Sequence, residues 1–449
     1  MQVREEPDMT PERRKRLLDE AADRAREVLG EKLDAAGDRD LTLDEIEDLV
    51  EETGREMDRW VQDRLITEQA PPAGNRADCP QCGAAARYKQ TLETELLTIH
   101  GRQAMIARHY RCEGCGHGFA PLHAVLGVEK GRRATRRVRG WLAKYGVEEA
   151  SFAAVPPILS ELRGLEVSAS TVERTTVEVG LAVAAANREA AGSGTGPETE
   201  KVYLAMDGTM CPLREPWRKD GTLGKLQCRY GEAKVGMAFT TGRKEGLDTG
   251  IVSRECVATL NKIGPFTRLM LWLAGRWGAG RAKELIVLGD GAAWIWALTR
   301  KHFPHAVEIL DYWHVLKHLW ELAELRFGAR TSEAAKAWVG AMRSLLEQDL
   351  VETVITDIES WEPRLRKHRA TRDKGAAFLR ENRERLRYQT FLAKGYLLGS
   401  GPIEARCKQV VQSRLHEGGM HWREQTAEAV LSIRAALHGT RGVDLRAYA

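Results

Sequence analysis

Four cysteines in two pairs give the sequence its clearest chemical signal. Cys79 and Cys82 stand in "CPQCG", Cys112 and Cys115 stand in "CEGCG", and 29 residues separate the pairs. Two thiolates from each pair can bind Zn²⁺ tetrahedrally, and the glycine after each pair suits a tight turn. The residues between the pairs alternate apolar and polar around His100–Gly101, as in a hairpin. We therefore predict a zinc ribbon, with a redox-active dithiol as the alternative.

Two histidines form a second possible metal site in "EILDYWHVLKHLW", residues 308 to 320. His314 and His318 are four residues apart, which places them on one face of a helix at a spacing that can bind zinc. No glutamate occupies the position that a metalloprotease needs for its general base. Because the four cysteines supply a better zinc site, we interpret His318 as a core or surface residue.

Three carboxylates could bind a hard cation such as Mg²⁺ or Mn²⁺, which requires clustered oxygen ligands. "KVYLAMDGT" predicts an apolar strand that ends at Asp207, and "ELIVLGDGAAWIW" predicts a buried strand that ends at Asp290. Such strand ends meet at one edge of a sheet. Glu404, in the helical turn that begins at Gly401-Pro402, is the third candidate. Taken singly, each residue also fits an ordinary turn or a carboxylate that complements a helix dipole.

The elements that must position these carboxylates follow a regular order. Between residues 200 and 328 the patterns predict three strands, a helix, a strand, a helix, a strand and a helix. This order is typical of a mixed sheet of the ribonuclease H kind. The remaining cysteines, Cys211, Cys228, Cys256 and Cys407, show no pairing pattern and are interpreted as small buried residues.

A basic stretch and two helices follow the ribbon. Residues 130 to 144, "KGRRATRRVRGWLAK", contain seven basic residues and no acidic one. Two predicted helices joined by "RGLEV" come next, and Ser170 with Glu173 predicts a capping box at the second. The pattern predicts a helix-turn-helix whose second helix enters the major groove of DNA. A solvated basic face and an ordinary helical pair are the alternatives.

The residues expected to contact DNA form two groups. The leading face of the second helix would consist of Thr171, Glu173, Arg174 and Thr175. The phosphate contacts would come from Arg132, Arg133, Arg136, Arg137 and Arg139.

Charge is distributed unevenly along the 449 residues. Residues 1 to 70 carry 12 Lys and Arg and 22 Asp and Glu, a net charge of −10, so the remainder carries +14 of the total of +4. This predicts an acidic segment on a body that prefers a polyanion, although a solvated helical pair is the alternative. Thr10-Pro11 and the pair Thr42 and Glu45 predict the starts of two helices. "APPAGNRAD", residues 70 to 78, predicts a linker, and "GSGTGPET", residues 192 to 199, a flexible joint.

Localisation is predicted from two missing signals. No apolar run approaches the roughly 18 residues of a membrane helix, and the first residues contain no apolar signal core. We therefore expect a cytoplasmic, nucleoid-associated protein with no membrane partner.

Several motifs together resemble one family. "MDGT", "LGDGAAWIW", "DYWH" and "GSGPIEARCKQVVQSRLHEGGMHW", with the two cysteine pairs, resemble the bacterial insertion-sequence DDE transposases of the ISKra group, which are related to Mutator-like transposases. The likeness covers residues 75 to 440. It implies that Asp207, Asp290 and Glu404 are catalytic and bind Mg²⁺. Asp311 to His314 resembles the Asp/Cys-x-x-His signature of Mutator-like transposases. Asp311 and His314 are therefore expected just outside the metal shell, with His314 contacting a DNA phosphate or orienting a carboxylate.

The resemblance also implies a helical insertion within the catalytic domain, which gives an α+β multidomain architecture. Its expected parts are an acidic helical segment (1–70), a zinc ribbon (75–125), a helix-turn-helix region (130–191), a ribonuclease H-like mixed α/β catalytic core (200–328), a helical insertion (329–396) and a C-terminal part of the core that carries Glu404 (397–440).

The predicted function is that of a transposase. Such an enzyme would bind the terminal inverted repeats of its own element in double-stranded DNA, cut them with Mg²⁺ and join them to target DNA, as a homodimer or larger synaptic oligomer. One alternative is a non-catalytic DNA-binding regulator derived from a transposase, against which the three intact carboxylates argue. Another is a structure-specific nuclease, for which the predicted DNA-binding regions are less suited.

Overall fold

The computed structural model describes residues 10–71, 73–189, 196, 198–214, 228–244, 247–260, 262–416 and 418–449. Most of the predicted joint at residues 192–199 lies outside these ranges. The chain forms two compact units, one of residues 1–141 and 153–171 and the other of residues 142–152 and 172–449. Among the described residues, no helix has both the length and the apolar character needed to cross a membrane.

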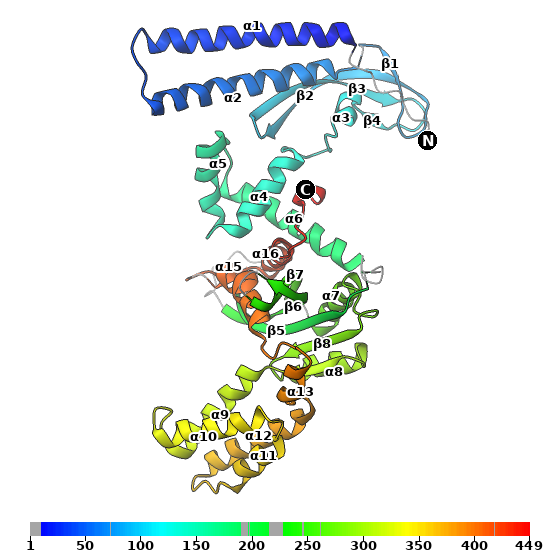
Figure 1. Ribbon diagram of the computed structural model, residues 1–449. Helices are drawn as coiled ribbons and strands as arrows, with labels where there is room; N and C mark the ends of the chain where they lie inside the picture. The colour runs from blue at the N-terminus through cyan, green and yellow to red at the C-terminus, as the bar shows by residue number, and fades with distance from the viewer. Residues whose placement is uncertain are drawn as a thin grey trace. The chain divides into compact units, whose positions relative to one another are not determined.

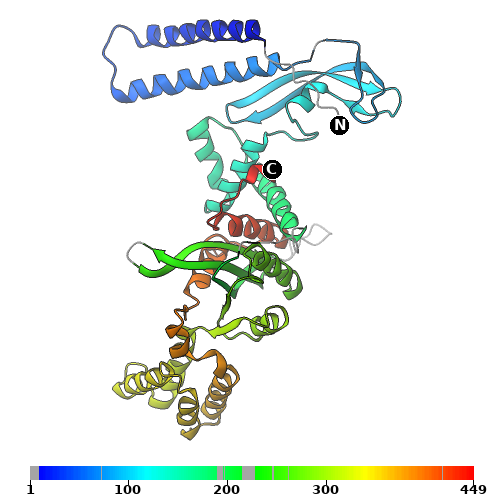
Figure 2. The same ribbon diagram turned by 45° about the vertical axis from the view of Figure 1, so that its right-hand side comes forward.

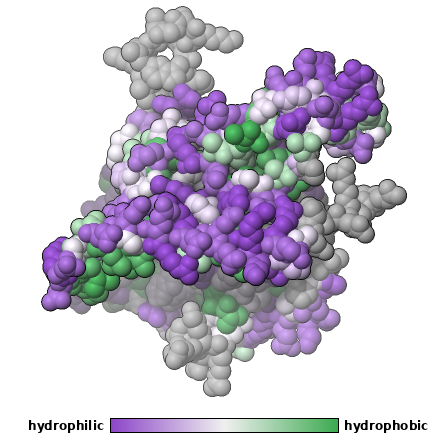
Figure 3. Space-filling model, turned by 90° about the horizontal axis from the view of Figure 1, so that it is seen from above, coloured by the Kyte–Doolittle hydropathy of each residue, from purple (hydrophilic) through white to green (hydrophobic). Residues whose placement is uncertain are grey.

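The first unit begins with a helical hairpin of α1 (Pro11–Ala36) and α2 (Leu43–Glu68) (Figure 1). Both predicted starts are confirmed, because Thr10 accepts a hydrogen bond from the third residue of α1 and Thr42 forms a full capping box with Glu45. Val28 is the one buried residue of the two helices. Ion pairs across the hairpin replace a core, and the surface drawn in Figure 3 is correspondingly mostly hydrophilic, with apolar patches.

An antiparallel sheet follows the hairpin in the order β1-β2-β3-β4. Its strands are β1 (Arg76–Asp78), β2 (Ala85–Thr98), β3 (Gly101–Cys112) and β4 (Gly118–Phe119). Thr98 pairs with Gly101 across a two-residue turn, which confirms the predicted hairpin. Gly83 and Gly116 have φ values of 74° and 72°, the left-handed conformation expected after each cysteine pair.

A short helix α3 (Pro121–Val125) ends the segment predicted as the zinc ribbon. Three α-helices follow in the predicted helix-turn-helix region, namely α4 (Arg136–Glu148), α5 (Val155–Arg163) and α6 (Ala169–Glu189). The capping box predicted at Ser170 and Glu173 is wrong, because α6 begins earlier than expected. Ser168 Oγ instead accepts the N–H of Thr171 at 3.2 Å.

The second unit contains a five-stranded mixed sheet in the order β7-β6-β5-β8-β9. Its strands are β5 (Lys201–Arg214), β6 (Cys228–Lys244), β7 (Leu247–Thr259), β8 (Glu284–Gly289) and β9 (Val307–Leu310). The first three run antiparallel, whereas β8 and β9 run parallel to β5 (Figures 1 and 2). Val202–Met206 and Ile286–Leu288 are fully buried, as expected for central strands covered on both faces.

Helices connect the strands in the predicted order, with α7 (Ile263–Arg276), α8 (Ala293–His302) and α9 (Tyr312–Phe327). Residues 329–396, all of them described, contain helices and no strand. These helices are α10 (Glu333–Leu346), α11 (Val351–Ser360), α12 (Arg366–Asn382) and α13 (Tyr388–Ala393). The helices α10 to α12 pack on one another, and α10 and α12 also pack on α9 (Figure 2).

The C-terminal part returns to the sheet as one continuous helical segment. It consists of α14 (Gly401–Arg406), a π-helical turn (Cys407–Gln412) and α15 (Ser413–Leu415). Gln412 Nε2 donates to Thr209 Oγ1 at 3.1 Å, which attaches the segment to β5. In α16 (Glu424–Leu437), buried Arg434 donates to the carbonyls of Gln409 and Val410 within the π turn. π turns are rare and occur often at functional sites.

Candidate functional site

The register of the sheet brings the first two carboxylates to one level. β5 and β8 are parallel neighbours, and their last paired residues are Ala205 and Leu288. Asp207 and Asp290 each lie two residues further along, so the two adjacent chains carry them to the same edge. The prediction that the strand ends at Asp207 is wrong, because β5 continues to Arg214 by pairing with β6.

The helical segment 401–415 adds the third carboxylate. Cys407, one turn beyond Glu404, donates its thiol to Asp207 Oδ2 at 3.4 Å. Burial raises the pKa of Asp207, and the negative charges of Asp290 and Glu404 raise it further. The hydrogen bond from the N–H of Gly208 acts in the opposite direction and lowers this pKa. Asp290 and Glu404 therefore each lie within electrostatic reach of Asp207. Asp207 and Asp290 are half-buried and Glu404 is exposed, which leaves the cluster open to a large substrate.

The turn after Asp290 depends on a glycine. Asp290 Oδ1 accepts the N–H of Ala292 at 2.9 Å, and Gly291 between them has a φ of 103°. A Cβ at Gly291 would lie 2.7 Å from Cε2 of Phe378 in α12. Only glycine combines this positive φ with the small volume that the close approach of Phe378 requires. Helix α12 of the segment 329–396 therefore packs directly against the Asp290 turn.

His314 and His318 are both half-buried. The two rings are 5.1 Å apart, and the His318 ring lies 4.8 Å from that of Phe378. Burial lowers the pKa of His318, with a smaller contribution from the charge of His314. Neither ring hydrogen-bonds to the three carboxylates in the described part of the chain. His318 is linked to the Asp290 turn through Phe378, which lies beside Gly291. The expected contact of His314 with phosphate or carboxylate stays a prediction.

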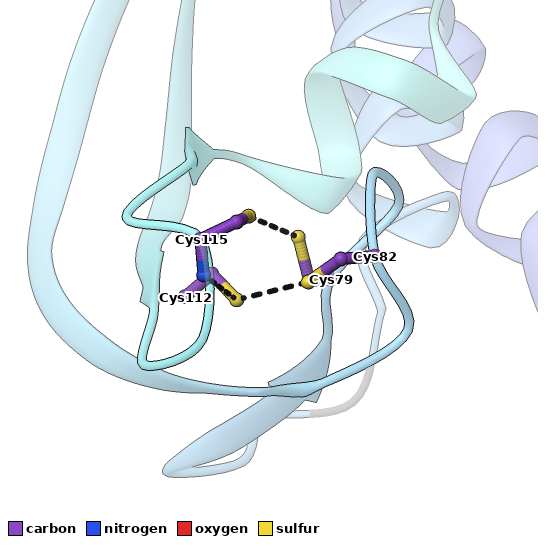
Figure 4. A group of neighbouring side chains, drawn as sticks. All are labelled: Cys79, Cys82, Cys112 and Cys115. Atoms are coloured by element: carbon purple, nitrogen blue, oxygen red, sulfur yellow. Dashed lines mark hydrogen bonds between the residues drawn. The ribbon is translucent and has the colours of Figure 1, made fainter.

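The four cysteines come together in the first unit (Figure 4). Their sulfur atoms all lie within 4.8 Å of one another, and no other group of three or more potential ligands in the described residues is as close. The Sγ atoms of Cys79 and Cys115 are 3.7 Å apart, and those of Cys82 and Cys112 are 3.4 Å apart. This cluster can hold a structural metal such as zinc.

The thiols of this cluster differ in acidity. The N–H of Cys115 is the largest of several influences that lower the pKa of Cys112 to about 6. The N–H of Ala84 lowers the pKa of Cys82, but hydrogen bonds shared with Cys112 and Cys115 outweigh it and raise that pKa to about 12.

The predicted phosphate contacts are not equally accessible. Arg139 is only 5% exposed, which does not favour its expected role. Arg133 and Arg137 are exposed, and Arg136 Nη2 pairs with Glu129 Oε1 at 2.6 Å. Arg132 also pairs with Glu129, through Nε and Oε2 at 3.6 Å.

The predicted leading face of α6 is partly accessible. Arg174 is exposed, whereas Thr171 and Glu173 are half-buried. Thr175 is 6% exposed, so it does not belong to an accessible face.

Sequence reasoning missed the role of Cys407. It is buried as predicted, together with Cys211 and Cys256, while the side chain of Cys228 lies outside the described residues. What was missed is the thiol's hydrogen bond to Asp207. Its position three residues after Glu404, on one face of the same helical turn, was the available signal.

Comparison with known proteins identifies a family. No curated protein matches the chain. The chain is similar to the solved structure of the Drosophila P element transposase strand transfer complex, with a TM-score of 0.33 and 10% identity over 71% of this chain and 96% of that one. This score is too low to support an argument about the present chain. The model of the uncharacterised protein family UPF0236 matches residues 84–448. Since that match covers most of the sequence, the protein belongs to the UPF0236 family.

Proposed function

We propose that the protein is a DDE transposase with a ribonuclease H-like core. The observation that carries this proposal is the convergence of Asp207, Asp290 and Glu404 from a central strand, the end of its parallel neighbour and a distant helix. The strand order β7-β6-β5-β8-β9, with three antiparallel strands followed by two parallel ones, supports the assignment of the core. The helical residues 329–396 fit the expected insertion.

The donor set suits Mg²⁺ or Mn²⁺. Its three side chains offer only carboxylate oxygens, the ligands that hard divalent cations prefer. Burial is the main reason that the pKa of the half-buried Asp207 is raised, and the like charges of Asp290 and Glu404 raise it further. A bound divalent cation would neutralise that repulsion and stabilise the charge that develops during displacement at phosphorus.

The expected reaction is phosphodiester hydrolysis followed by transesterification. Water attacks the phosphorus at the element's end, the bond to the 3′ oxygen breaks, and a free 3′-OH remains. That hydroxyl then attacks a target phosphodiester, so one P–O bond forms as another breaks and no cofactor supplies energy. Asp207, Asp290 and Glu404 would hold the divalent cations that position the reacting phosphate, and no side chain forms a covalent bond with DNA.

Basic surfaces would hold the DNA. Residues 364–374 in and before α12 carry five exposed basic side chains without an ion-pair partner among the described residues. These are Arg364, Arg366, Lys367, Arg369 and Lys374. Since α12 also packs against the Asp290 turn through Phe378, this surface is well placed for DNA that enters the carboxylate cluster.

Arg136→Ala combined with Arg137→Ala is expected to flatten the salt dependence of DNA-end binding. Each lost phosphate contact should reduce the slope of log K against log salt by about 0.9. Arg14→Ala with Lys15→Ala removes the same charge from two exposed positions of acidic helix α1 and serves as the control, for which the slope should not change. Filter binding or fluorescence anisotropy over a salt series measures it. An unaltered slope in the Arg136 and Arg137 variant would move the phosphate contacts elsewhere.

A strand-transfer assay tests the function as a whole. The full chain would be incubated with Mg²⁺, DNA carrying the sequences that flank its gene, and a target plasmid. Nicked ends and joined products are expected. Specific end binding without either product would instead favour a non-catalytic regulator, while cutting at DNA junctions regardless of sequence would favour a structure-specific nuclease.

A further inference from the structure

Asp311 lies at the junction of the elements that carry two of the carboxylates. It caps the N-terminus of α9 and is only 1% exposed. Its backbone N–H donates to the carbonyl of Gly289, the residue before Asp290, at 2.9 Å. Its side chain accepts hydrogen bonds from the backbone N–H groups of His314, within the cap, and of Ser400, 89 residues away in the chain.

Ser400 is the residue from which the Glu404 helix starts. Its carbonyl accepts the N–H of Glu404 at 3.1 Å. Next to Asp311, the N–H of Tyr312 donates to the carbonyl of Leu398 at 3.0 Å and reinforces the same connection. Through these bonds Asp311 joins the end of β8, where Asp290 follows, to the first turn of α14, where Glu404 stands.

We propose that Asp311 is a positioning residue that fixes the spacing between Asp290 and Glu404. This inference rests on the proposed function, because it gives the spacing a purpose in holding a divalent cation. A buried carboxylate that accepts hydrogen bonds from two backbone N–H groups forms strong, directional bonds that fix the positions of both backbone segments. Without it the start of α14 can move relative to β8, and outer-shell supports of this kind govern how well the inner ligands bind a cation.

Asp311→Asn tests the proposal with little change in size. Asparagine offers one acceptor oxygen in place of two, so one of the two N–H groups loses its partner. We expect the affinity for Mn²⁺, measured by electron paramagnetic resonance of the free ion, to fall about tenfold. The Mg²⁺ concentration for half-maximal DNA cleavage should rise by a similar factor, while DNA-end binding stays unchanged. Amide hydrogen exchange in residues 399–406 should become faster.

Asp349→Asn is the matched control. Asp349 also accepts two backbone N–H groups from a distant segment, those of Gln389 at 2.8 Å and Thr390 at 3.1 Å, but these begin α13. This variant should leave Mn²⁺ affinity and exchange in residues 399–406 as in the unmodified chain. Equal effects of the two variants, or wild-type values for Asp311→Asn, would overturn the proposal. If the unmodified chain binds Mn²⁺ but cleaves no DNA, the proposed function fails while the positioning role is still decided by affinity and exchange.

An independent observation concerns Trp313. Its side chain is 64% exposed, and no other tryptophan in the described part of the chain is classed as exposed. The ring lies over Gly399, where an added Cβ would be 3.3 Å from Cδ1, and its neighbour Tyr312 meets it edge-on at 5.2 Å. The indole therefore packs on Gly399, beside the start of the Glu404 helix, and is otherwise exposed to solvent.

We infer that Trp313 stacks on an unpaired nucleobase of DNA bound at the carboxylate cluster, which again rests on the proposed function. Aromatic side chains bind unpaired bases through their faces, with little dependence on sequence. Trp313→Ala should weaken binding of a DNA end with a few unpaired nucleotides about tenfold, leave binding of the fully paired end unchanged, and be largely rescued by Trp313→Phe.

Leu392→Ala is the control for Trp313→Ala, because Leu392 is a similarly exposed apolar residue at 56% on α13. It should bind both DNA ends as the unmodified chain does. A loss by Trp313→Ala that is equal for paired and unpaired ends, or no loss, would overturn the inference. Because this readout is binding, it is separate from failure of the unmodified chain to cleave DNA.

Discussion

Alanine in place of Asp207, Asp290 or Glu404 is expected to abolish Mg²⁺-dependent cleavage of DNA ends, with a rate loss of about a thousandfold or more. The three side chains come from separate elements and approach one another only in the folded protein. Loss of any one leaves two carboxylates, too few to hold the divalent cations that would position the reacting phosphate. Gel assays of nicking and strand transfer would measure the effect.

DNA-end binding should survive these substitutions. The predicted end-binding residues belong mostly to the first unit, whereas the carboxylates lie in the second. Asp207→Asn should also leave the fold intact or slightly more stable, because the amide carries no charge next to Asp290 and Glu404. Thermal unfolding would detect an unfolded variant, and Glu333→Gln, an exposed carboxylate at the start of α10, is the control for lost charge. Cleavage that persists in one variant would remove that residue from the proposed site.

The core sheet could be predicted because its signal is local. Central strands covered on both faces read as continuous apolar runs, as in "KVYLAM" and "ELIVLG", and an aspartate directly after such a run marks a strand end. Asp290 fulfils this pattern. Asp207 does not, because the antiparallel partner β6 extends β5 beyond it. The hydrophobic pattern of the sequence shows where a run of apolar residues ends. The length of a strand also depends on the neighbouring strand with which it pairs.

Other features depend on contacts between distant residues. No local pattern distinguishes Glu404 from a carboxylate that merely complements a helix dipole, so the sequence offered it only as a candidate and the resemblance gave it a catalytic role. The bond from Ser400 to Asp311 joins residues 89 positions apart, and the bond from Cys407 to Asp207 spans 200. Burial of Arg139 likewise follows from packing that a run of basic residues does not reveal. These hydrogen bonds and the burial of Arg139 result from tertiary contacts. Periodicity and residue spacing in the sequence do not predict such contacts.

Cys82→Ser or Cys112→Ser is expected to remove zinc from the protein and unfold the sheet β1 to β4. The hydrophobic cluster around these thiols has only four fully buried members, Cys79, Ala86, Tyr110 and Cys112. So small a core does not stabilise a fold alone, and structural zinc typically supplies about 10 kcal/mol or more. Zinc content by elemental mass spectrometry and hydrogen exchange in β2 and β3 would measure both effects.

Acidity should control zinc binding in a defined direction. A thiol must lose its proton to become a ligand, so zinc affinity falls as the pH falls. In the metal-free ribbon the pKa of Cys112 is about 6 and that of Cys82 about 12. Titration with zinc should therefore release protons, and this release should be lost in Cys82→Ser, which is expected to bind no zinc.

Cys256→Ala provides the control, since Cys256 is buried in β7 of the other unit. It should keep the zinc content and the exchange pattern of β2 and β3. Loss of the ribbon by Cys82→Ser should weaken DNA-end binding without unfolding the carboxylate cluster, because the two lie in separate units. Unchanged zinc content in Cys82→Ser would rule out the four-thiolate site, and unchanged end binding after zinc loss would show that the ribbon supports the fold without touching DNA.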